Sequence, residues 1–592
     1  MHDHPTVIRN GLVLDGTGAP PREADVLLVD GRIAELGEVP LVPVGTAEID
    51  ARGCWVTPGF LDNHTHYDAE VALAPGLGES VRHGVTSVVL GSCSLSFVAA
   101  APEDCADLFT RVESVPRDHV LPMLREVKRW SDPAGWRAWI DGHPIGPNVA
   151  TYLGHSDIRA AVLGLSPSVD AAVRPDAAAL ERLGALLDQA LDCGFLGLSE
   201  MTNPWDRLDG DREWSKPLPS TFARRRERRF LHEKLRARGA ILQTAPNLVT
   251  RVNVLGMVLD SGGLRLRAPL KTTLITMMDL KADPYVFWLT STLAALANRW
   301  LGGDLRWQSP PVPFDLYYDG MDSVLFEEFP TGQAVRDLAR DLGRRRALLR
   351  DPAWRRGFRR EMHKRLSPRV WHRDLGDARI LDCPDRSVVG KSFADVARER
   401  GEDPVTVFVD LLAEHDTALR WHTCLANHRP EVLERILAHP HTFVGFADSG
   451  AHLRNMAFYN FPLRMLKRVR DAERAGRPFL TPEAAVHRLT GEQAAWFGLD
   501  VGVLAPGRRA DVVVLDPERL DDRVEQVHLA PFPELGGLER CVNRGDAARH
   551  VWIGGVEVAR DGDPLPVLGQ RRTGTFLEAA RTGATAQLQS SQ

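Results

Sequence analysis

The strongest constraint on the fold is a contrast between the two ends and the middle of this 592-residue chain. Near both termini, short β-type runs are separated by turn pairs, such as Asn10-Gly11, Asp30-Gly31 and Gly554-Gly555, a pattern typical of hairpins. In the middle, buried-type strands such as 86–90 and 194–198 alternate with helical stretches, which indicates a parallel sheet or a barrel. We therefore expect the terminal segments to meet as one small β domain beside a large α/β domain.

Composition favours a packed globular protein. Lys and Arg number 73 against 79 Asp and Glu, a formal net charge of −6, so no overall basic field favours nucleic acid or anionic lipid. The basic run 222–238 is interspersed with glutamates and predicts a solvated outer helix. The longest apolar stretch, 285–301, contains too many polar residues for a membrane span.

The cysteines and the amino terminus suggest where the protein resides. Seven cysteines without C-x-x-C spacing argue against a disulfide framework and for a reducing compartment. The first residues lack a basic segment followed by an apolar one, so no secretory leader is visible. We expect a cytoplasmic protein.

Two histidines in the stretch 57–68 are the first candidates for chemistry. His64 and His66 lie two residues apart, and in a strand such residues point the same way, so both imidazoles can face one metal ion. An isolated H-x-H pair is also common as ordinary polar residues, and the spacing alone leaves both interpretations open.

Several motifs together resemble the amidohydrolase superfamily. Residues 57–66 are similar to its opening barrel strand, and 504–516 to its return into a β-sandwich. Residues 84–93, ending in Cys93, resemble the second-strand motif of the N-acyl-D-amino-acid deacylase (D-aminoacylase) branch, whose cysteine binds or bridges zinc. Residues 154–156 and 194–199 also match this branch, and 446–452 place Asp448 where the branch has its eighth-strand aspartate.

The resemblance runs from about residue 7 to about residue 560 and implies a domain organisation. We expect a (β/α)8 TIM-type barrel over about 56–490, and a small β-sandwich built from 1–55 and 491–565, with a tail at 566–592. A stretch rich in Trp and Arg at about 279–379 matches poorly. We expect this insertion to form either a lid over a site or an assembly surface of a homo-oligomer.

The resemblance also implies a metal site. His64, His66, Cys93 and Asp448 would hold about one Zn²⁺ per chain, and other divalent metals are alternatives. Metal binding would deprotonate the Cys93 thiol, and Asp448 would act as general base for the attacking water. The structural alternatives are a buried apolar role for Cys93 and a turn role for Asp448.

The sequence departs from the branch at two strand ends. The fifth and sixth strands normally each supply a histidine, but neither 240–247 nor 268–273 contains one. Four residues are candidates for the missing functions, each with a structural alternative: Lys271 as a substrate-binding or carbamylated lysine, His422 as a ligand ending the seventh strand, His155 as a group that polarises the substrate or supports the ligands, and Arg454 as a carboxylate-binding arginine.

The expected function is metal-dependent hydrolysis of a non-peptide C–N bond in a small-molecule amide, foremost an N-acyl-D-amino acid. The aromatic insertion favours a second hypothesis, hydrolysis of a cyclic or lipid amide. The two missing histidines favour a third, a catalytically weak relative that binds rather than cleaves.

Overall fold

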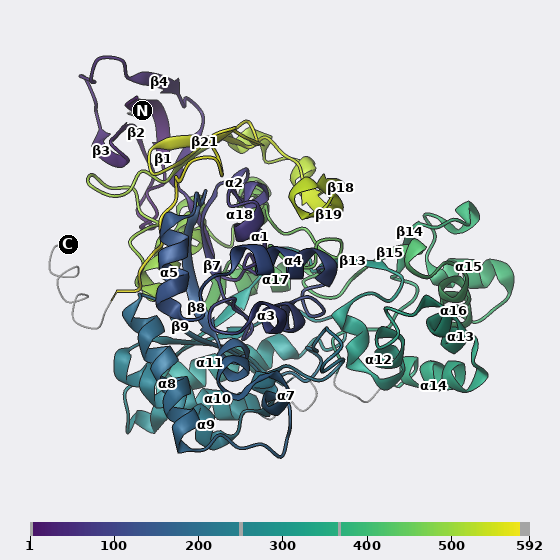
Figure 1. Cartoon of the computed structure of the whole chain (residues 1–592). Coiled ribbons are helices and arrows are strands. Elements are labelled where there is room, and N and C mark those ends of the chain that lie inside the picture. The colour runs from purple at the N-terminus through teal and green to yellow at the C-terminus, as the bar shows by residue number, and fades with distance from the viewer. Residues whose placement is uncertain (1–3, 248–252, 365–368, 581–592) are drawn as a thin grey trace.

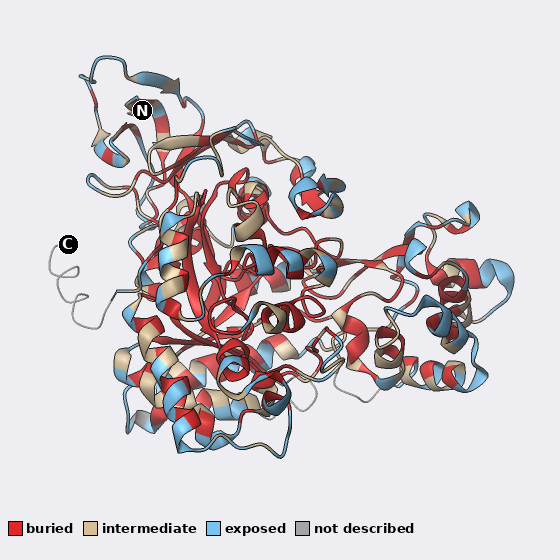
Figure 2. Ribbon diagram, viewed as in Figure 1, coloured by how far each residue is buried: buried red, intermediate tan, exposed pale blue. Residues whose placement is uncertain are grey.

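The computed structural model describes residues 4–247, 253–364 and 369–580. Its centre is a curled sheet of eight parallel strands (Figure 1), which confirms the expected (β/α)8 barrel. The strands are almost entirely buried (Figure 2), as expected where helices cover a parallel sheet. In spatial order they are β6 (Phe60–Asp62), β7 (Val85–Leu90), β8 (Asn148–Gly154), β9 (Gly197–Met201), β10 (Ile241–Ala245), β11 (Lys271–Ile275), β12 (Asp304–Ser309) and β16 (Thr442–Val444).

Helices surround this barrel and begin where local sequence favours them. Asp176 caps α8 by accepting a hydrogen bond from the Ala179 amide, and Thr481 caps α19 with a proline at its first position. No helix in the described ranges is both long and apolar enough to cross a membrane. The helices of the barrel domain are α1 (Glu70–Leu73), α2 (Gly78–Val81), α3 (Pro102–Phe109), α4 (Arg117–Val127), α5 (Pro133–Gly142), α6 (His155–Leu163), α7 (Leu165–Ser168), α8 (Ala177–Asp192), α9 (Arg225–Arg238), α10 (Asn253–Gly262), α11 (Val286–Trp300), α17 (Pro430–Leu437), α18 (Phe461–Arg474), α19 (Pro482–Leu489) and α20 (Gly491–Phe497).

Segments from the two ends of the chain pair in a second sheet. Strand β5 (Trp55–Pro58) runs antiparallel to β17 (Val512–Leu515), and buried Val56 and Trp552 belong to the core of this sheet. The expected β domain from both ends is therefore present, as a nine-stranded sheet with a separate hairpin. The other strands of the sheet are β1 (Thr6–Val13), β2 (Arg22–Val29), β3 (Arg32–Gly37), β4 (Ala47–Asp50), β20 (Ala548–Ile553), β21 (Val556–Arg560) and β22 (Asp563–Pro564), and the hairpin is β18 (Val527–Phe532) with β19 (Leu538–Asn543).

A lobe, residues 315–424, leaves the barrel between β12 and β16 and projects to the right in Figure 1. It packs around aromatic side chains, with Trp371 in ring contact with both Trp421 and Phe408. Its elements are β13 (Asp315–Asp319), α12 (Pro330–Arg336), α13 (Leu342–Arg350), α14 (Pro352–Met362), β14 (Arg379–Asp382), α15 (Phe393–Arg400), α16 (Pro404–His415) and β15 (Arg420–Cys424).

The lobe differs from the insertion expected at about 279–379. The first part of that stretch forms α11 and β12, which are a helix and the seventh strand of the barrel itself. The chain leaves the barrel later than expected and returns later, because β15 pairs with β13 and β14 in a three-stranded antiparallel sheet of the lobe.

Candidate metal centre

The residues expected to bind metal meet at the carboxyl ends of the barrel strands. His64 and His66 follow β6, Cys93 follows β7, and Asp448 follows β16. The first and last strands are joined here, since the Asp448 amide donates to the His64 carbonyl at 3.1 Å and the His66 amide donates to the Ser449 carbonyl at 2.7 Å. Closure of the barrel thus brings the two ends of the site together.

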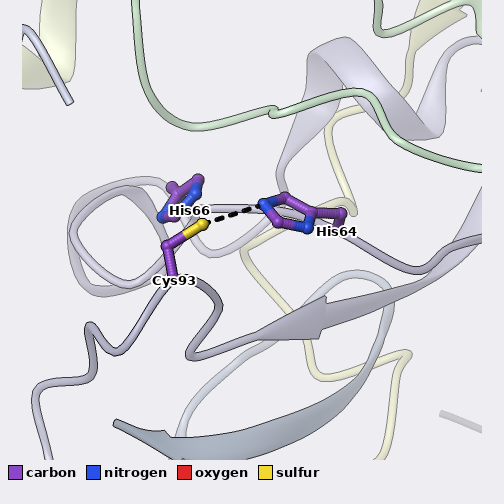
Figure 3. A group of neighbouring side chains, drawn as sticks. All are labelled: His64, His66 and Cys93. Atoms are coloured by element: carbon purple, nitrogen blue, oxygen red, sulfur yellow. Dashed lines mark hydrogen bonds between the residues drawn. The ribbon is translucent and has the colours of Figure 1, made fainter. Parts of the chain in front are cut away.

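The side chains are spaced as metal ligands require. One ligand atom from each of His64, His66 and Cys93 lies within 4.8 Å of the other two, and the Cys93 sulfur is 3.4 Å from His64 Nε2 (Figure 3). Asp448 Oδ1 lies 3.5 Å from His64 Nε2 and 3.3 Å from His66 Nε2. Ligands around tetrahedral zinc are separated by about 3.3–3.8 Å, from bond lengths of roughly 2.0–2.3 Å.

Two further residues orient the imidazoles. Gln308 Oε1, on β12, lies 2.7 Å from His64 Nδ1, and Glu113 Oε1 lies 3.3 Å from His66 Nδ1. The Gln308 acceptor favours a proton on His64 Nδ1, which leaves His64 Nε2 with its lone pair directed at the site. Burial lowers the pKa of His66, but Glu113 and Asp448 outweigh it and raise that pKa well above its ordinary value, so this ring must give up a proton when it binds a metal ion. Two imidazoles, a thiol and a carboxylate are a donor set that fits Zn²⁺.

Burial sets the protonation of these groups. It lowers the pKa of His64 to about 4 and raises the pKa of Cys93 to about 12, so the first is a neutral imidazole and the second needs a bound cation to become a thiolate. Burial also raises the pKa of Asp448, but hydrogen bonding and charge from His66 outweigh it and hold that pKa well below the usual value. Asp448 is therefore ionised.

The backbone is strained at three residues of the site, two of which are expected metal ligands. Cys93, Asp448 and His452 have positive φ angles of 55°, 55° and 50°, which cost non-glycine residues about 1–3 kcal/mol each and persist where the surroundings impose them. The loop after Cys93 is fixed by the buried carboxylate of Asp157, which accepts hydrogen bonds from Ser96 Oγ and from the backbone amides of 98–100.

At the strand positions without histidine, polar side chains face the same region. On the fifth strand, buried Gln243 accepts a hydrogen bond from the Cys93 amide at 3.0 Å. Within the described ranges, its Nε2 and the buried hydroxyl of Thr273 on the sixth strand have no hydrogen-bond partner. The fifth strand thus positions the cysteine ligand through an amide.

Two sequence expectations are corrected by the strand assignments. Lys271 begins β11, at the amino end of the barrel, and its Nζ donates to the Trp496 carbonyl at 2.9 Å. A carbamylated Lys271 therefore cannot bridge metals at the carboxyl ends. His422 lies in β15 of the lobe, 3.1 Å from Asp315, rather than at the end of the seventh barrel strand, which is β12.

The other two candidates are held by carboxylates. His155 is fully buried between Glu200, 3.4 Å away, and Glu227, 2.9 Å away, so the structure supports its structural alternative more directly than a contact with substrate. Arg454 bonds Asp319 at 2.6 Å and also pairs with Glu539. It lines a cavity of about 630 Å³ at the junction of the barrel and the lobe.

Sequence reasoning missed three residues of the site. Glu113 lies in no motif, and its Oε2 is 3.6 Å from His452 Nε2, which is itself 3.7 Å from Asp448 Oδ2. His452 lies in the motif 446–452 beside Asp448, which was the one available indication. Gln308 was missed because it lies in the stretch interpreted as an insertion. The alternation of polar and apolar residues in Asp304–Ser309 is nevertheless that of a strand.

Comparisons with known proteins agree with this geometry. No family model matches the chain. An uncharacterized protein of Mycobacterium tuberculosis is 49% identical over 588 residues, covering 98% of this chain and 96% of that protein. N-acyl-D-glutamate deacylase of Alcaligenes xylosoxydans xylosoxydans is 28% identical over 549 residues, 91% and 93% of the two chains. The solved structure of N-acyl-D-glutamate deacylase from Bordetella bronchiseptica, complexed with zinc and a phosphonate inhibitor, has a TM-score of 0.62 at 23% identity, covering 97% of this chain and 99% of that one. The chain therefore has the amidohydrolase fold of the solved D-aminoacylases and N-acyl-D-glutamate deacylase, and its sequence is similar to that of an N-acyl-D-glutamate deacylase over about nine-tenths of both chains.

Proposed function

We propose that the protein hydrolyses the amide bond of N-acyl-D-amino acids with the help of one zinc ion per chain, in the cytoplasm. The observation that carries the proposal is the convergence of His64, His66, Cys93 and Asp448 at the carboxyl ends of the barrel strands. The deacylases among its relatives support the substrate class. Seven free cysteines support a reducing compartment.

The proposed ligands are the Nε2 atoms of His64 and His66, the Cys93 sulfur and the Asp448 carboxylate. When bound there, zinc supplies a Lewis acid for the amide carbonyl and lowers the pKa of a coordinated water. The protein contributes the orientation of both imidazoles through Gln308 and Glu113, as described above.

Asp448 is the proposed general base. Its side chain is 12% exposed, whereas that of His64 is fully buried, so the carboxylate lies on the more open side of the site. It is ionised and can take a proton from the attacking water and deliver it to the leaving nitrogen. His452 Nε2 lies 3.7 Å from the second oxygen of Asp448, where a protonated imidazole would stabilise the charge of that carboxylate.

The cavity beside the site is the proposed substrate entrance. Ser114 and Leu453, which line it, directly follow Glu113 and His452 in the chain. One wall comes from the lobe, including Arg336 and Arg340. We propose that the lobe limits access to the site and that Arg454 helps to hold a substrate carboxylate there once its pairing with Asp319 is exchanged.

The activity of the Asp448→Asn variant distinguishes the hypothesis of an enzyme from that of a catalytically weak binding protein. General-base catalysis contributes about 10²- to 10⁴-fold in rate, so the zinc-loaded variant should lose that much turnover while still binding substrate. The wild type is first screened against N-acyl-D-amino acids, their L-enantiomers, cyclic amides and fatty amides. Asp500→Asn, at an exposed position, is the matched control. Absence of turnover with zinc, cobalt and manganese, or full activity of Asp448→Asn, would contradict the proposal.

A further inference from the structure

Exposed apolar side chains gather on one part of the outer wall. Of the fourteen large hydrophobic residues that are exposed in the described ranges, nine lie on or beside α10 and α11. The exposed fractions include 56% for Trp288, 65% for Trp300 and 84% for Leu266. These nine form what we call the α10–α11 surface: Leu255, Leu259, Leu264, Leu266, Tyr285, Trp288, Leu289, Leu296 and Trp300.

The helix α11 is apolar on two sides. Its buried side, with Phe287 and Leu293, packs toward the barrel, while Trp288 and Leu289 face outward. Arg299 is the only charged residue among its fifteen. A helix that only covers a barrel carries a polar outer face, and a contiguous exposed apolar patch marks a surface that contacts something else.

The neighbouring helix α9 is basic. Its His232 lies 3.3 Å from Asp260 of α10, and Arg236 donates to the Asp260 carbonyl at 2.8 Å. Arg225 and Arg229 lie on the same helical stripe one and two turns earlier, and both are exposed. Neither forms an ion pair with any carboxylate of the described residues. All three helices lie at the lower end of the molecule in Figure 1.

The charge of this region opposes that of the rest of the chain. Residues 224–300 contain 14 Lys and Arg against five Asp and Glu, a formal charge of +9, whereas the whole chain has −6. Because the net charge of the whole chain is small, no anionic partner was expected. The charge is nevertheless distributed unevenly along the chain. Basic residues around exposed tryptophans and leucines are the features of segments that lie in the interface of anionic bilayers.

We propose that the α10–α11 surface, together with basic helix α9, docks the protein peripherally on an anionic membrane surface. The tryptophans and leucines would enter the headgroup boundary, and Arg225 and Arg229 would face the lipid phosphates. A second copy of the chain fits less well, because pairing two such surfaces would bring the exposed Arg225 and Arg229 of both copies close together.

Vesicle sedimentation tests this proposal with the full chain. Vesicles of phosphatidylcholine alone are compared with vesicles that also contain phosphatidylglycerol, each at low and high salt. We expect binding to the anionic vesicles, weakened by salt. Trp288→Ser/Trp300→Ser and Arg225→Glu/Arg229→Glu should each reduce that binding about tenfold or more. Leu41→Ser/Val44→Ser, at more exposed apolar positions in the β domain, should leave it unchanged.

Two results would overturn the proposal. One is a wild type that stays in the supernatant with anionic vesicles at low salt, while its thermal unfolding shows it to be folded. The other is a lipid-free dimer in light scattering that Trp288→Ser/Trp300→Ser converts to a monomer, since the surface would then be covered by a second copy. The arginine pair keeps the test decisive if the tryptophan variant does not fold.

Discussion

Replacement of Gln308 by leucine should weaken zinc binding without touching a ligand. The Gln308 carbonyl accepts from His64 Nδ1 at 2.7 Å in a fully buried setting. Without that acceptor, the proton on Nδ1 loses its partner, and the tautomer with Nε2 free is no longer favoured. Loss of such an outer partner costs about 10- to 100-fold in metal affinity, or roughly 1.4–2.7 kcal/mol.

The stability of the metal-free protein should change much less. Leucine leaves His64 Nδ1 unsatisfied, which costs about 1–3 kcal/mol. The same change removes Gln308 Nε2, which has no hydrogen-bond partner within the described residues, so one buried unsatisfied donor replaces another. The predicted signature is therefore a changed zinc Kd with a nearly unchanged Tm of the metal-free form.

The assay is competition for zinc between the protein and a chromogenic chelator, with the absorption of the cobalt-loaded protein as a second readout. Gln308→Glu is the matched control, because it keeps an acceptor at the same place and should retain the affinity. A zinc Kd for Gln308→Leu equal to that of the wild type, with the Tm also unchanged, would refute the idea that β12 orients His64.

Two other predictions concern the metal and the pH dependence of stability. Cys93→Ala should lose zinc in elemental analysis, since the remaining imidazoles and carboxylate lack the thiolate that binding deprotonates; full metal content would make Cys93 a packing residue only. Burial lowers the pKa of His232, but Glu200 and Asp260 outweigh it and raise the pKa from 6.5 to about 9. The folded state should thus gain up to about 3 kcal/mol below pH 6.5 and lose it as the pH rises to about 9. His232→Gln should flatten this decline in urea unfolding, and an equal decline in both proteins would contradict the assignment.

The sequence was most informative where chemistry and strand ends coincide. His64, His66, Cys93 and Asp448 each follow a buried strand directly, and parallel strands place their carboxyl ends together. Their meeting could therefore be predicted without knowing how the barrel closes. The two β-rich ends could be paired because hairpin patterns recur at both.

The errors arose where strand boundaries decide the outcome. Residues 268–273 were assigned to the end of the sixth strand, whereas that strand is Lys271–Ile275 and Lys271 begins it. Whether Lys271 begins or ends the strand determines the end of the barrel at which the amine lies, and propensity does not fix that boundary. The strand β12 (Asp304–Ser309) lies in the Trp- and Arg-rich stretch that was interpreted as an insertion, so His422 was assigned to the end of the seventh strand. Glu113 reaches His66 only through tertiary packing, which no local pattern encodes.

The junction of the first and last barrel strands has a consequence for the order of folding. The Ala447 amide donates to Asp62 across a separation of 385 residues, and the Asp448 amide bonds the His64 carbonyl beside it. Closing so long a loop costs conformational entropy and contributes to slow folding. An ion bound by His64, His66 and Asp448 would cross-link the ends of the first and last barrel strands. Without the metal, the strands and helices would still form, but the contact between the first and last strands would open first. Hydrogen exchange in β6 and β16 should therefore be faster than in the other barrel strands when zinc is removed.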